Sequence, residues 1–132
     1  MGSAILLLAG MLALEDPPKD VIDFFRSMAT ALGNAHRDGS AEAFLEHFDT
    51  SMPGYAEFSG RIGAMAAVGE VGTAIDFVNV KPDGAKMTLD LDWLLEPEGQ
   101  QPRRAVLQCT IEKRGKKWKV TSLAPLEFFK RD

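Results

Sequence analysis

Gly115-Lys116-Lys117-Trp118-Lys119-Val120 is the stretch that decides the fold of this chain. It has the pattern of the closing strand of a small antiparallel sheet: a glycine turn, an alternation that places Trp118 and Val120 on one face, and an end at Pro125. We expect a two-residue turn at Arg114-Gly115, which pairs Lys113 with Lys116. That register sets Trp118 opposite Ile111, Val120 opposite Cys109, and Lys117 opposite Glu112.

The two strands before it alternate in the same way, with apolar side chains on one face and polar side chains on the other. The inward-facing set is Met87, Leu89, Leu91, Trp93 and Leu95, followed by Ala105, Leu107, Cys109 and Ile111.

A further strand begins at Thr73 and leads into the turn Lys81-Pro82-Asp83-Gly84. We expect a three-residue loop with Lys81 opposite Ala85. In that register the inward-facing residues are Ile75, Phe77 and Asn79, and Asp76 faces outward. A four-residue loop would instead turn Asp76 inward, where burial would raise its pKa.

Residues 17–70 have helical spacing instead. A first helix starts at Asp16-Pro17-Pro18 and a short second one follows Gly39-Ser40. A third covers 55–70. Their inward residues are Val21, Phe25, Met28 and Leu32; then Phe44, Leu45 and Phe48; then Tyr55, Phe58, Ile62, Met65 and Ala66. The sequence therefore predicts an α+β fold, with three N-terminal helices packed on a curved four-stranded antiparallel sheet.

The composition fits one globular domain: 132 residues, of which 45% are hydrophobic and 26% are charged. The net charge of -4 argues against nucleic-acid binding, because phosphate contacts need a basic surface. Residues 101–132 nevertheless carry nine basic and three acidic side chains. We interpret them as basic strands beside acidic strands and helices, with a basic docking face as the alternative. Cys109 is the only cysteine, which excludes an internal disulfide and a multi-cysteine metal site.

Residues 1–14 are expected to be a signal-peptide-like segment, and residues 15–132 the folded domain. The uncharged run Ala4–Leu14 has the length of a signal-peptide core and falls short of the roughly 20 residues of a membrane span. No basic residue precedes the run, and Met11 stands where cleavage favours a small residue. We favour export to the periplasm or the medium. A cytoplasmic protein with this segment packed on the domain is the alternative.

Three helices followed by a four-stranded meander resemble the nuclear transport factor 2-like superfamily, a cystatin-like α+β cone, and in particular its bacterial members of unassigned function. The resemblance covers residues 17–129. It rests on Val21–Leu32, Ala41–Phe48, Ile75-Asp76-Phe77, Leu91–Leu95, Gly115–Val120 and Pro125–Phe129. It implies a pocket between the concave sheet face and the helices, and homodimers through the outer sheet face. The superfamily contains isomerase-like, cyclase-like and dehydratase enzymes as well as binding modules, so the fold alone does not decide the function.

The predicted pocket is apolar, and its candidate ligand-binding residues are Asn79, Phe77, Met87, Leu89, Trp93 and Trp118. Such a face lacks the base and the oxyanion donor that proton transfer needs. The resemblance offers Asp49 as a base, because isomerase-like relatives carry one near this position, and Tyr55 as a hydroxyl donor. The ordinary interpretation is a turn-forming Asp49 and a core Tyr55.

We therefore expect a non-catalytic binding or interaction module that takes a small lipophilic ligand. We expect no cofactor, no nucleic-acid partner and no stable membrane span. No metal is expected either, because His36 and His47 lack the spacing of a metal site. The alternative is a ketosteroid isomerase-like or dehydratase-like enzyme that uses Asp49 and Tyr55 for proton transfer.

Overall fold

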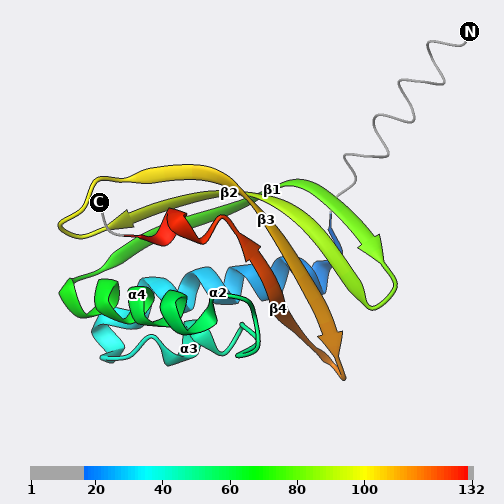
Figure 1. The fold of residues 1–132 in the computed structure, drawn as a ribbon, viewed down its shortest axis with the longest axis horizontal. Helices are drawn as coiled ribbons and strands as arrows, with labels where there is room; N and C mark the ends of the chain where they lie inside the picture. The colour runs from blue at the N-terminus through cyan, green and yellow to red at the C-terminus, as the bar shows by residue number, and fades with distance from the viewer. Residues whose placement is uncertain (1–16, 131–132) are drawn as a thin grey trace, which may run out of the picture.

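The computed structural model describes residues 17–130, so the signal-like segment predicted at residues 1–14 lies outside the described residues. The described elements come in the predicted order, three helices and then four strands, with a short 3-10 helix at the end. Figure 1 shows the curved sheet lying over the helices. The α+β architecture is therefore confirmed.

The longest helix, α2 (Lys19–Asp38), buries the predicted face of Val21, Phe25, Met28 and Leu32. It ends at Gly39, whose φ of 72° is left-handed and lets the glycine N–H bond back to the last turn. The face is buried because apolar side chains spaced by three and four residues lie on one side of a helix.

The two shorter helices, α3 (Glu42–Leu45) and α4 (Tyr55–Val68), complete the helical layer. They bury the predicted Phe44 from α3 and Phe58, Ile62, Met65 and Ala66 from α4. No helix in the part of the chain that the structure describes has the length and apolar content needed to cross a bilayer.

The sheet is an antiparallel meander in the order β1-β2-β3-β4. Its strands are β1 (Val71–Asp83), β2 (Lys86–Pro97), β3 (Arg103–Arg114) and β4 (Lys117–Ala124). The inward alternation predicted for the two central strands is confirmed, because Met87, Leu89, Leu91, Trp93 and Leu95 are all buried, as are Leu107, Cys109 and Ile111.

Both predicted hairpin registers were wrong. The first turn is Gly84-Ala85, so that Asp83 pairs with Lys86, and the last is Gly115-Lys116, so that Arg114 pairs with Lys117. Each glycine stands first in its two-residue turn, with φ of 62° and 64°. A type II′ hairpin turn needs positive φ at that first position, whereas the sequence pattern had suggested turns in which the glycines come later.

A β-bulge at Val78 changes the faces of β1. Phe77 pairs with Leu91 before the bulge and Asn79 pairs with Asp90 after it. The inward placement of Asn79 was therefore wrong: it lies on the polar face, with its amide Nδ2 3.5 Å from Asp90 Oδ2. Asp76 pairs with Asp92 and faces outward, as predicted.

The 3-10 helix η1 (Leu126–Phe129) packs its two phenylalanines into the core. The ring of Phe129 lies edge to face against Phe58 and against Trp93, with centroids 5.0 Å and 5.2 Å away. The end of the chain thus joins helix α4 to the inner face of the sheet.

Candidate functional site

The inner sheet face, predicted to line a ligand pocket, is occupied by the protein's own side chains. Met87, Leu89 and Trp93 are at most 4% exposed and belong to the hydrophobic core. Phe77 is half-buried and packs edge to face on Phe25, with centroids 5.5 Å apart. The only polar atom of the Trp93 side chain, Nε1, donates to Thr73 Oγ1 at 2.7 Å, so its hydrogen bond is made inside the protein.

Asp49, the predicted base, is held as a turn carboxylate. Its Oδ1 accepts from the N–H of Ser51 at 2.8 Å and from the Ser51 hydroxyl at 2.7 Å, while Oδ2 pairs with Arg114. The Ser51 hydroxyl and N–H, followed by Arg114, lower the pKa of Asp49 to about 2. A carboxylate with so low a pKa is a poor proton acceptor near neutral pH.

Tyr55, the predicted hydroxyl donor, is the first residue of α4 and is half-buried against the core. Neither Tyr55 nor Asp49 lines the groove described next. The two predicted catalytic residues are therefore part of the turn and core structure around the start of α4.

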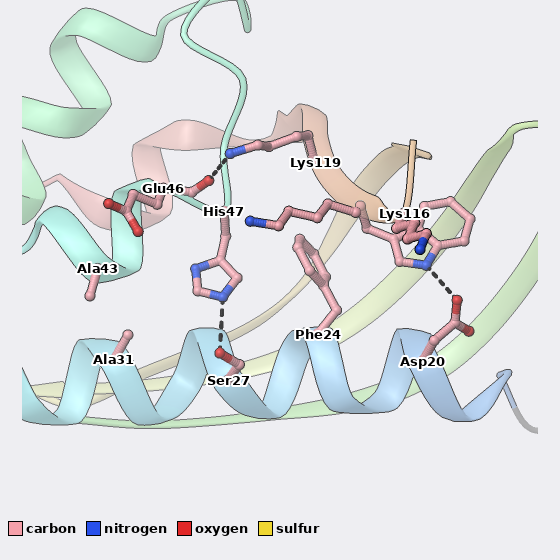
Figure 2. A pocket seen from close by; sticks show the side chains of 11 residues that line it. Asp20, Phe24, Ser27, Ala31, Ala43, Glu46, His47, Lys116 and Lys119 are labelled. Carbon is pink, nitrogen blue, oxygen red and sulfur yellow. Dashed lines mark hydrogen bonds between the residues drawn. The ribbon is translucent and has the colours of Figure 1, made fainter. Parts of the chain in front are cut away.

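A groove of about 690 Å³ lies outside the filled core, between α2, the segment that follows α3, and the start of β4. Figure 2 shows its residues. The wall from α2 consists of Asp20, Phe24, Ser27 and Ala31, which follow one another at helical spacing. Ala31 and Ala43 are two small side chains that face each other at the end of the groove opposite Asp20.

His47 is the central side chain of the groove. Its Nδ1 lies 3.1 Å from Phe44 O, which can only accept, so Nδ1 carries the proton and Nε2 accepts from the Ser27 hydroxyl at 3.2 Å. Its ring packs on Phe24 with centroids 5.2 Å apart. Burial is the main cause that lowers the pKa of His47 below 6.5, so the imidazole is neutral at pH 7.

The segment of His47 is fixed to the sheet by backbone bonds. Val120 N–H donates to His47 O and Asp49 N–H donates to Val120 O, both at 2.9 Å, which forms a parallel bridge between Phe48 and Val120. This bridge covers part of the edge of β4 and brings His47 beside the β3–β4 hairpin.

Trp118 forms the other end of the groove. It pairs with Lys113 rather than Ile111, is half-buried, and packs against the edge of the core. Its Nε1 donates to Asp20 Oδ2 at 2.9 Å, and Lys113 Nζ lies 3.1 Å from the same oxygen and 5.3 Å from the centre of the indole. The hydrogen bond from Trp118 is the main cause that lowers the pKa of Asp20, and the bond from Lys113 lowers it further.

Lysines make the hairpin side of the groove basic. Lys116, Lys117 and Lys119 all line it. Lys119 Nζ donates to the backbone carbonyl of Glu46, and within residues 17–130 neither Lys116 nor Lys117 pairs with a carboxylate. Within residues 17–130, no group of three or more His, Cys, Asp or Glu side chains is placed to hold a metal ion.

Of the predicted ligand-binding residues, only Trp118 lines this groove. The spacing of Phe24, Ser27 and Ala31 defines a second face of α2 that could have been found from the sequence. The bridge that brings His47 to β4 joins residues far apart in the chain, and no local pattern reveals it.

No family model matches the sequence, and no curated protein matches it. Several solved structures match the fold of this chain. The Bd1075 protein of Bdellovibrio bacteriovorus is 14% identical with a TM-score of 0.67, over 80% of this chain and 38% of that one. This chain thus spans well under half of the Bdellovibrio protein.

Two bacterial structures of unknown function are closer in length. An NTF-2 like protein of Shewanella oneidensis has 13% identity and a TM-score of 0.61, over 79% of this chain and 93% of that one. A domain with a cystatin-like fold from Nostoc punctiforme has 16% identity and a TM-score of 0.57, over 82% of this chain and 76% of that one. At these identities the likeness shows the fold alone.

Proposed function

We propose that this chain, which has the nuclear transport factor 2-like fold, is a non-catalytic binding module that takes a small ligand in the groove between α2 and β4. One observation carries the proposal. The inner sheet face is filled by the chain's own aromatic side chains, whereas the groove outside it stays open and has the volume of a small-molecule site.

Proton-transfer chemistry is the alternative function, and the geometry favours it less. Asp49 is engaged by Ser51 and Arg114, and its lowered pKa removes the basicity that an isomerase-like reaction requires. The groove itself contains a neutral His47, but both ring nitrogens already have partners. A binding role needs only the shape and the side chains that are present.

The proposal is tested by filling the groove. Ala43 is exposed on α3 and lines the groove, so Ala43→Trp is expected to fill the groove without disturbing the core. Ala64→Trp is the matched control, because Ala64 is exposed on α4 and does not line the groove. Both variants and the wild type are compared by calorimetric titration with compounds selected from a panel of small molecules that differ in charge and ring content.

We expect a panel compound to bind the wild type and Ala64→Trp equally and to lose binding to Ala43→Trp. Equal binding to all three proteins, or binding of no compound to the wild type, contradicts the proposed function.

A homodimer through the outer sheet face is a second proposal, and exposed valines support it. Val78 and Val106 are 49% and 56% exposed on β1 and β3. If this face joins two copies, Val106→Lys is expected to shift sedimentation from dimer to monomer. A wild-type protein that stays monomeric at high concentration contradicts it.

A further inference from the structure

The chemistry of the groove indicates which class of ligand it takes, and this inference rests on the proposed function. Its length is lined by three rings, from Phe24, His47 and Trp118. The first two are in contact, and the indole of Trp118 is held in place by its bond to Asp20. Rings fixed in this way offer flat apolar surface at low entropic cost, which suits a planar aromatic body.

The charge of the groove is positive. Lys113 and Trp118 both engage the carboxylate of Asp20, which leaves Glu46 as the other acidic side chain of the lining. Figure 2 shows Asp20 and Glu46 at opposite ends, with Phe24 and His47 between them. Three lysines therefore face one carboxylate that no ion pair within residues 17–130 neutralises.

Lys116 and Lys117 are the two lysines whose ammonium groups are available to a ligand. Lys119 is bonded to the Glu46 carbonyl, whereas Lys116 at the hairpin tip and Lys117 at the start of β4 are exposed and line the same groove as Trp118. A groove that combines fixed rings with exposed ammonium groups suits a molecule that has both an aromatic ring and an anionic group.

We propose that the groove binds a small organic anion with a planar aromatic body, whose rings pack against Trp118 and Phe24 and whose anionic group meets Lys116 and Lys117. The carboxylate at the Trp118 end, that of Asp20, is already bonded to Trp118 Nε1 and to Lys113 Nζ. The neutral His47 adds apolar surface and no competing charge at pH 7.

Two probes with the same rings test the charge requirement. Anilinonaphthalene sulfonate is anionic, and phenylnaphthylamine has the same ring system without the sulfonate. We expect the sulfonate to bind at least about fivefold more tightly at low salt, and added salt to reduce that preference. Fluorescence titration of each probe gives the dissociation constants.

Lys116→Gln with Lys117→Gln is expected to remove the preference for the sulfonate. The matched control is Lys81→Gln with Lys86→Gln, which removes two exposed lysines from around the first hairpin turn and should keep the preference. Ala43→Trp should weaken both probes.

Failure of this inference and failure of the proposed function give different results. If both probes bind equally and Ala43→Trp blocks both, the ligand class is wrong and the groove remains a binding site. The ligand class is also wrong if the preference survives in the Lys116/Lys117 double variant. If neither probe binds, the ligand class is wrong and the panel titration still tests the groove. If no panel compound binds either, or if Ala43→Trp leaves the binding of both probes unchanged, the proposed function itself is overturned.

Discussion

Phe129 packs edge to face on Trp93, with ring centroids 5.2 Å apart and ring planes at 85°. The last residues of the domain thereby occupy the inner face of the sheet at its central strand, and both rings are 1% exposed. The space that the sheet and helices enclose is therefore core at this point. Trp118, in contrast, lines the groove outside this packed face.

Removing the Phe129 ring should reveal how much this packing stabilises the domain. We expect Phe129→Ala to lower the free energy of unfolding by about 3–5 kcal/mol, because it leaves a cavity beside Trp93 and Phe58. Val68→Ala, at an exposed position on α4, should change it by less than about 0.5 kcal/mol. Urea denaturation measures both, and similar values for the two variants would contradict the assigned role of Phe129.

Two glycine substitutions should change the free energy of unfolding in opposite directions. Gly115→Ala is expected to cost about 1–2 kcal/mol, because its φ of 64° is left-handed and strained for a side chain even where space is open. Gly33→Ala lies inside α2 with no atom near the new methyl group, and should stabilise by about 0.5–1 kcal/mol. Thermal and urea unfolding would check both. A stabilised Gly115→Ala would show that the turn is not as described.

Asp49 should make the domain sensitive to acid. Its pKa is lowered from 3.8 to about 2, so the stability that its ionised form contributes is complete above pH 3.8 and is lost as the pH falls toward 2. Asp49→Asn should flatten this part of the profile of unfolding free energy against pH. Asp83→Asn, at an exposed hairpin position, is the control and should leave the loss in place.

His47 should affect the stability of the domain at a higher pH than Asp49 does. Because burial lowers its pKa below 6.5, the unfolded chain binds the proton more readily than the folded one. Stability is therefore complete above pH 6.5 and falls as the pH drops through the lowered pKa of the folded state. Between about pH 8 and about pH 5, His47→Gln should reduce this loss. Ser27→Ala should retain it, since burial rather than the Ser27 hydroxyl is the main cause; a flat wild-type profile would contradict the assignment.

Periodicity was enough to predict the helices and the inner face of β2 and β3, because those elements bury one side and expose the other. It failed at the hairpins, where a glycine with positive φ had to stand first in each turn and a bulge at Val78 reversed the faces. Asn79 was misplaced for that reason. Trp118 was correctly placed on the inward side, but its partner on β3 is Lys113, two residues beyond the predicted Ile111, so that it lies at the edge of the core and lines the groove.

The two tryptophans of the chain occupy opposite environments, and this gives the protein a pair of internal optical reporters. Trp93 is sealed in the core with its indole N–H on Thr73, so its emission should be blue and should change only when the domain unfolds. Trp118 is partly exposed to solvent and bonded to Asp20, and it lines the groove. Its emission should therefore be red-shifted and should change when a ligand occupies the groove. One emission spectrum should therefore separate loss of fold from arrival of a ligand.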